Sequence, residues 1–250
     1  MFILFALIFM RMTGCIALNP ILGRSNIPNA AKGAVILSLS FLMYMGTDGV
    51  LAHEPAVLLE FALMLVKELL IGFAIGFSME LSFAVVRFAA AVLDYIMGLS
   101  MAQVYDPQYN TQMTITSGMF YTFLVLLFLV GDGQVHLMAL IYRSADLVPF
   151  GEVVIRPELS QLMLEIFKTS IVTGLQLAFP IIAMELVAEA AVGILMRVIP
   201  QINVFAVNFQ MKIIMGLVLL VYLFNPMAAK MYMIIDNIYL YIEEVLMVMG

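Results

Sequence analysis

Charge and cysteine are both scarce in this 250-residue chain. Only 11% of its residues are Asp, Glu, Lys or Arg, against about 25% in a typical soluble domain. The single cysteine, Cys15, excludes a disulfide framework and a thiolate metal site within the chain. Tryptophan is absent, and the two histidines, His53 and His136, have no second ligand at metal spacing. These absences argue against a soluble fold and against a metalloenzyme.

Other signatures of catalysis are also missing. No glycine-rich phosphate loop with a following Lys-Ser or Lys-Thr is found. Gly98-Leu-Ser100 lacks the second glycine of a nucleophile elbow. The charges are scattered, with a net value of −6, and form no basic patch for nucleic acid. We therefore expect a protein that is not an enzyme, needs no cofactor and binds no nucleic acid.

Apolar residues are abundant instead. They make up 64% of the chain, and the mean hydropathy is +1.10. A soluble fold of this size could not bury so much apolar surface, so the composition predicts an integral membrane protein. Residues 1–10 are apolar, without a positive leader or a following cleavage site, and are interpreted as the first helix rather than a signal peptide. The apolar runs predict an all-α protein of roughly six to eight helices.

One apolar run is too long for a simple span. Ala56–Ala102 contains no proline, and as a single helix it would be about 70 Å long, more than twice a hydrocarbon core of ~30 Å. We expect this run to break near Gly72, Gly76 and Ser78. A second long helical pattern, Leu159–Val198, contains Pro180, which predicts a kink.

A polar stretch separates two apolar runs in the middle of the chain. From Gln103 to Ser117 the only formal charge is Asp106, and Asp106-Pro107 is a turn signal. Such a loop can be an ordinary external connection. Alternatively it can lie at membrane depth, where protein or a water-filled cavity must satisfy its backbone. The second interpretation would make the loop part of a pathway.

Charged residues recur inside the apolar runs at helical spacing. Glu80, Arg87 and Asp94 are seven residues apart, as are Glu60 and Lys67, so each set lies on one helix face. Charges inside membrane helices are costly and usually face protein or a water-filled path. We interpret the Glu80–Asp94 stripe as a buried helix–helix interface, and a conduction path is the alternative.

A second charged face lies further along the chain. Glu185 and Glu189 are four residues apart, and Gly193 and Arg197 continue their face. Because adjacent carboxylates repel, two arrangements are open: one of them holds a proton, or both meet basic groups. A structural ion-pair network is favoured, and a proton relay is the alternative.

Several stretches together resemble one protein family. They are Arg11-Met-Thr-Gly14, Ile27-Pro28, Lys67-Glu-Leu-Leu-Ile-Gly72 with Gly76-Phe77, Gly98-x-Ser100 followed by Asp106-Pro107, and Arg197-Val-Ile-Pro-Gln-Ile-Asn-Val-Phe205. The set is similar to the FliR family, the R component of the flagellar protein-export gate, which has counterparts in virulence type III secretion. The order and spacing match along nearly the whole chain, and the last stretch is the most specific.

The resemblance implies an unusual architecture. One R chain of kinked helices and helical hairpins would complete a helical export-gate ring with several copies of the P and Q components. Residues 1–165 would be P-like and include the plug loop near 103–117, and residues 166–250 would be a Q-like hairpin region. Further implied partners are the switch component that wraps the gate, the large export-gate ring protein, membrane lipid and unfolded export substrates.

The resemblance also implies roles for individual residues. The candidate channel plug comprises Tyr105, Asp106, Pro107, Gln108 and Tyr109. The candidate subunit-contact or buried charges are Lys67, Glu68, Glu80, Arg87, Asp94, Glu185, Glu189 and Arg197. The candidate cytoplasmic-entrance hairpin contributes Pro200, Gln201, Asn203 and Phe205.

Two functions from different classes remain in view at the level of sequence. The first is a structural and gating subunit of the flagellar type III export channel, located in the bacterial inner membrane within the basal body. It would pass unfolded flagellar proteins across the cell membrane. The second is a self-contained proton- or ion-coupled transporter of small solutes, which the carboxylates Glu185 and Glu189 would serve.

Overall fold

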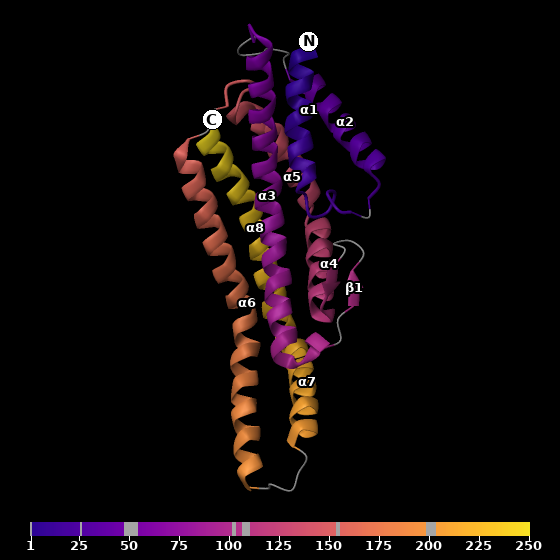
Figure 1. Ribbon diagram of the computed structural model, residues 1–250, viewed down its shortest axis with the longest axis vertical. Helices are drawn as coiled ribbons and strands as arrows, with labels where there is room; N and C mark the ends of the chain where they lie inside the picture. The colour runs from indigo at the N-terminus through magenta and orange to yellow at the C-terminus, as the bar shows by residue number, and fades with distance from the viewer. Residues whose placement is uncertain are drawn as a thin grey trace. The chain divides into compact units, whose positions relative to one another are not determined.

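The computed structural model describes residues 2–25, 27–47, 55–101, 104–106, 111–153, 156–198 and 204–250. Helices dominate these residues (Figure 1). The α-helices are α1 Phe2–Ala17, α2 Asn29–Gly46, α3 Leu58–Met97, α4 Ile115–Val130, α5 Gly133–Leu147, α6 Pro157–Val198, α7 Val204–Tyr222 and α8 Phe224–Met249. A 3₁₀ turn, η1 Leu99–Met101, and two strands, β1 Val104–Asp106 and β2 Thr111–Met113, lie between α3 and α4. The expected all-α fold is confirmed.

Two of these helices are long and apolar enough to cross a membrane. They lie at Leu58–Ile96 and Pro157–Leu195 in α3 and α6. The pairs α4 with α5 and α7 with α8 meet the same criteria when each pair is taken as one broken span. Many large apolar side chains of α6 and α7, such as Phe179, Val187 and Val221, are exposed. Such surfaces suit contact with lipid or with other protein rather than with water.

Helix α3 corrects one expectation from the sequence. It runs without interruption for 40 residues, so the predicted break near Gly72, Gly76 and Ser78 is wrong. No proline interrupts the run, and a glycine lowers helix stability by only about 1 kcal/mol. Ser78 donates its hydroxyl hydrogen bond to the Ala74 carbonyl oxygen at 2.9 Å, which a helix accommodates. Helix α6 is also continuous from Pro157 to Val198, with Pro180 inside it, and the kink at Pro180 stays a prediction.

The glycines of α3 serve packing instead. A Cβ atom added at Gly72 would overlap the carbonyl oxygen of Arg11, and one added at Gly14 would overlap that of Leu69. A Cβ at Gly76 would lie 2.7 Å from the Cys15 carbonyl oxygen. The backbones of α1 and α3 therefore approach each other directly, as small residues permit in membrane helices.

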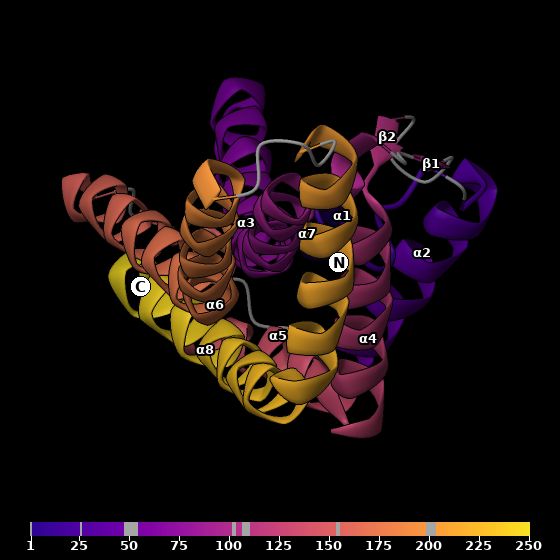
Figure 2. The same ribbon diagram turned by 90° about the horizontal axis from the view of Figure 1, so that it is seen from below.

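The chain divides into two compact units. The first comprises Met1–Phe83, Phe128–Thr169 and Ile235–Gly250, and the second comprises Ala84–Leu127 and Ser170–Ile234. The core of the first unit contains the buried side chains Leu7, Ile8, Met12, Ile71, Ile75, Phe128, Ile242 and Leu246. That of the second contains Val86, Leu93, Met97, Phe120, Leu124, Ala178 and Ile181. Within the second unit, α7 runs beside the later part of α6 (Figures 1 and 2).

Candidate functional site

Two short paired strands, named here the β1–β2 hairpin, lie within the plug loop near 103–117. Strands β1 and β2 pair antiparallel, with Tyr105 opposite Gln112 and Asp106 opposite Thr111. The hairpin lies beside the first part of α4 (Figure 2). The backbones of Tyr105 and Asp106 belong to β1, whereas Pro107, Gln108 and Tyr109 lie outside the described residues.

The hairpin joins a helix at each of its two ends, called its roots, and the first root is the end of α3. Gly98 follows the last helical residue and has a φ of +79°, a conformation that L side chains rarely adopt. A Cβ atom at Gly98 would lie 3.2 Å from the Phe209 ring of α7. Glycine at this position therefore both ends the helix and leaves room for the ring.

The second root of the hairpin is the start of α4, and Asp94 holds it. The Asp94 side chain is fully buried, and its Oδ2 accepts a hydrogen bond from the backbone N–H of Thr116 at 2.9 Å. The Ser117 hydroxyl donates to the Arg87 carbonyl oxygen at 3.2 Å. Two bonds thus connect the first turn of α4 to α3. The sequence alone could not reveal them, because each uses a backbone group.

Two members of the predicted stripe Glu80, Arg87 and Asp94 contact α4. Asp94 binds the start of α4, as just described. The Arg87 guanidinium lies over the Tyr121 ring, 5.5 Å from its centroid, a cation–π arrangement. Glu80 is half-buried in the first compact unit, whereas Arg87 and Asp94 belong to the second.

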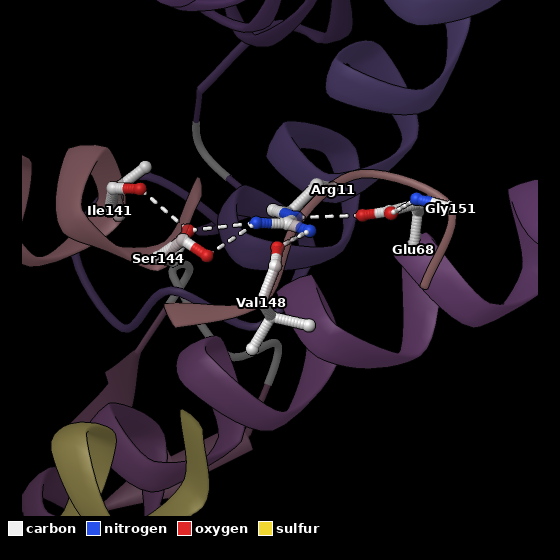
Figure 3. Close-up of polar contacts among 6 residues, drawn as sticks. All are labelled: Arg11, Glu68, Ile141, Ser144, Val148 and Gly151. Carbon is white, nitrogen blue, oxygen red and sulfur yellow. Dashed lines mark hydrogen bonds and ion pairs between the residues drawn. The ribbon is translucent and has the colours of Figure 1, made fainter. Parts of the chain in front are cut away.

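The most heavily bonded buried group is Arg11 of α1 (Figure 3). Its Nε donates to Glu68 Oε2 at 2.7 Å, and both side chains are fully buried. Nη1 donates to the carbonyl oxygen of Ser144 at 2.9 Å and to its hydroxyl at 3.2 Å, and Nη2 donates to the Val148 carbonyl oxygen at 2.8 Å. The guanidinium also lies 4.2 Å from the Phe150 ring centroid.

Glu68 completes this network. Its second oxygen, Oε1, accepts the backbone N–H of Gly151 at 3.0 Å. The pair therefore connects α1, α3 and α5 with the segment 148–151. The sequence predicted Glu68 as a buried charge but assigned it no partner. The available signal was Arg11 itself, the one charge in an otherwise apolar helix, since a buried guanidinium needs an anion and several acceptors.

The paired carboxylates of α6 have unequal environments. Glu189 is partly exposed, and its Oε1 accepts from Lys212 Nζ of α7 at 2.8 Å. Glu185, one turn earlier, is 1% exposed, and neither of its oxygens has a hydrogen-bond partner in the part of the chain that the structure describes. A Cβ atom at Gly216 of α7 would lie 3.0 Å from Glu185 Oε1. Glu189 thus faces Lys212, while Glu185 faces the glycine one turn further along α7.

The remaining predicted residues are dispersed. Lys67 is half-buried on α3, and Arg197 is exposed near the end of α6. Pro200, Gln201 and Asn203 lie outside the described residues, and Phe205 belongs to α7 without a described side chain. Across the described ranges, no three His, Cys, Asp or Glu residues are grouped closely enough to hold a metal ion.

Comparison with known proteins gives a consistent picture. The sequence model of the family described as "Bacterial export proteins, family 1" matches residues 2–238. The Flagellar biosynthetic protein FliR of Escherichia coli strain K12 is 30% identical over 215 residues, covering 84% of this chain and 80% of the relative. The Bacillus subtilis protein of the same name is 26% identical, covering 87% and 84%.

A relative from another kind of secretion system is also similar. The Secretion system apparatus protein SsaT of Salmonella typhimurium is 27% identical, covering 71% of this chain and 69% of the relative. The resemblance seen in the sequence motifs is thereby confirmed. With nearly its whole length matched by the family's sequence model, the chain belongs to the bacterial export proteins, family 1.

Proposed function

We propose that the chain is the R component of a flagellar type III protein-export apparatus. The observation that carries this proposal is family membership over residues 2–238, together with relatives named for flagellar biosynthesis and for a secretion apparatus. The long apolar helices α3 and α6 support a location in the bacterial inner membrane, and the relatives named for flagellar biosynthesis support a place within the flagellar basal body. Family membership does not favour the small-solute transporter.

The partners follow from the same proposal. The chain would assemble with the P and Q components, the switch component and the large export-gate ring protein, and unfolded flagellar proteins would pass through the complex. Residues 1–165 would occupy a P-like position, and residues 166–250 a Q-like one. The exposed apolar side chains of α6 and α7, with Lys67 and Arg197, provide surfaces for such contacts or for lipid.

Within this complex, we assign the β1–β2 hairpin the role of channel plug. Two features support the assignment. The stretch Gln103–Ser117 carries a single formal charge, and β1–β2 pairing satisfies part of its backbone without water. The hairpin is also held to α3 through Asp94 and Arg87, as a plug that must stay in place requires.

Composition of the complex is the first test. Native mass spectrometry would be performed on the tagged chain after gentle detergent extraction, with co-expression of the neighbouring membrane genes. We expect one copy of this chain with several copies of two smaller membrane proteins. A stable monomer or homodimer under the same conditions would contradict the proposal and favour the transporter.

The plug role has a separate test. Replacing residues 103–111 by a Gly/Ser linker should make the assembled channel leak ions, because the bulk that closes the lumen is removed. Membrane conductance of cells carrying this variant, compared with cells carrying an assembled wild-type complex, measures the effect. An assembled variant with unchanged conductance would show that the hairpin is not the plug.

A further inference from the structure

The start of α4 is capped by a residue from another helix. Thr114 is in the N-cap position, because its carbonyl oxygen accepts the first helical hydrogen bond, from Gly118 N–H at 3.1 Å. A threonine in this position normally uses its own hydroxyl to accept an N–H of the first turn. Here the Thr114 hydroxyl oxygen is buried and has no hydrogen-bond partner among the described residues. Asp94 of α3 accepts the Thr116 N–H instead.

This arrangement is strong for physical reasons. A carboxylate that accepts a backbone N–H at a helix N-terminus makes a charge-assisted hydrogen bond and also interacts favourably with the helix dipole. Asp94 is fully buried, so water cannot compete for the bond. The bond joins residues 22 positions apart, and the whole β1–β2 hairpin lies between them.

Only one of the two Asp94 oxygens takes part. Oδ2 binds Thr116, whereas Oδ1 is buried without a partner in the described ranges. An asparagine could therefore replace Asp94, keep the bond through its amide oxygen and lose no second contact. A leucine of similar size would leave the Thr116 N–H without this acceptor.

We propose that Asp94 is a positioning residue that latches the second root of the β1–β2 hairpin to α3 and so keeps the candidate plug closed. The inference rests on the plug role proposed above. Release of the Thr116 N–H would allow the first turn of α4 to fray, since the Thr114 hydroxyl has no partner among the described residues that would hold it. Of the two described bonds between the first turn of α4 and α3, only the weaker one from the Ser117 hydroxyl to the Arg87 carbonyl oxygen, at 3.2 Å, would then remain.

The test compares Asp94→Asn with Asp94→Leu in the assembled complex. Membrane conductance should rise roughly tenfold in D94L, the effect expected when a charge-assisted hydrogen bond is lost. The conductance of D94N should stay within about twofold of the wild-type value, because its amide oxygen still accepts the hydrogen bond from the Thr116 N–H. The conductance of Thr114→Val should also match wild type, since its hydroxyl has no partner among the described residues, and D94L combined with T114V should leak no more than D94L alone.

Two further variants separate the latch from general damage. Leu93→Ala removes a fully buried neighbour of Asp94 without touching the bond to Thr116. Asp94→Ser removes the acceptor by shortening the side chain, and it serves if D94L does not accumulate. Hydrogen exchange of the segment 114–120 should accelerate in D94L and D94S and remain slow in D94N.

The outcomes distinguish the two proposals. If the Gly/Ser linker leaks and D94L does too, while L93A and D94N do not, the latch is supported. If the linker leaks but D94L and D94S behave as wild type, or if L93A leaks as much as D94L, the latch is wrong and the plug role stands. An assembled linker variant that does not leak removes the plug role, and with it the latch.

Discussion

At the scale of single residues, two buried glutamates differ in whether they have partners. Glu68 is bonded through both oxygens, to Arg11 and to Gly151 N–H. Glu185 has no hydrogen-bond partner within the described chain. Burial of a carboxylate is costly unless bonds compensate for the lost hydration. Substitution by glutamine should therefore lower stability at position 68 and should not lower it at position 185.

Glu68→Gln should destabilise the protein by about 3 to 5 kcal/mol, the usual effect of breaking a buried ion pair, because Arg11 would keep its charge without a counter-ion. Thermal or denaturant unfolding in detergent measures the change. Replacing both members, as in R11M with E68L, should recover part of the loss, since no uncompensated charge remains. A single E68Q variant as stable as wild type would contradict this assignment.

Glu185→Gln should leave stability unchanged or raise it, because a neutral amide of the same shape replaces a buried carboxyl group that has no hydrogen-bond partner among the described residues. Glu189→Gln is the matched control one turn away. It removes the ion pair with Lys212. Because both side chains of this pair are partly exposed, the free energy of unfolding should fall by about 1 kcal/mol or less. Strong destabilisation by E185Q would indicate that Glu185 meets a cation in the working assembly.

At the scale of secondary-structure elements, α1 and α3 are joined by direct backbone contact as well as by the Arg11–Glu68 side-chain pair. Gly14 and Gly72 each lie against a carbonyl oxygen of the other helix. Dispersion contacts and close approach of this kind hold membrane helices together without a hydrophobic driving force. The length of α3 is a consequence of its composition, since the run contains no proline and few helix-weakening residues.

Gly72→Ala should separate α1 from α3 and lower the thermal stability of the protein, because the added methyl group overlaps the Arg11 carbonyl. Gly33→Ala in α2 is the matched control. A Cβ atom there meets nothing within 4 Å, so the change should be neutral or stabilising by up to about 1 kcal/mol. Equal behaviour of the two variants in a melting experiment would argue against the close contact.

Sequence reasoning worked best where composition decides the structure. The helical pattern at Leu159–Val198 predicted α6 to within two residues at its start and correctly at its end. The pattern could not separate the two uses of glycine in a helix, so the break predicted at Gly72 is wrong. Nor could it find the partner of Asp94, because that partner is the backbone N–H of Thr116, which every residue except proline possesses.

Long-range side-chain pairs were equally hard to predict. Arg11 and Glu68 are 57 positions apart, and no local periodicity links them. Lys212 is the one charged residue in an apolar run of the sequence. It meets Glu189 because α7 packs against α6. The plug residues Tyr105 to Tyr109, and the domain division at 165 and 166, remain predictions from the family resemblance.

At the scale of the whole molecule, α3 is too long to lie in one bilayer along its normal. Its 40 residues extend for about 60 Å, against a hydrocarbon core of ~30 Å. Leu58 and Tyr95, close to its two ends, are both strongly exposed. In an assembly, neighbouring subunits would cover the portion of α3 that lies outside the lipid.

Single cysteines at Leu58 and Tyr95, placed in a Cys15→Ser background, should report this arrangement. The two positions are about 55 Å apart along the helix, so they cannot both lie within the hydrocarbon core. We expect at least one to react with a membrane-impermeant maleimide when the chain is expressed alone. That site should become protected on co-expression with the neighbouring membrane genes. Reaction at neither site in the chain alone would contradict the prediction.

The contact of Gly14 with Leu69 and of Gly72 with Arg11 also limits how such chains can diverge. At an ordinary helix interface, substitution by a larger side chain on one helix can be compensated by a smaller side chain opposite. Where two backbones are in direct contact, no side chain lies between them that could become smaller. In related chains, substitutions should therefore accumulate around these two glycines while both positions remain glycine. A chain in which either glycine is replaced should have a different distance between the two helices.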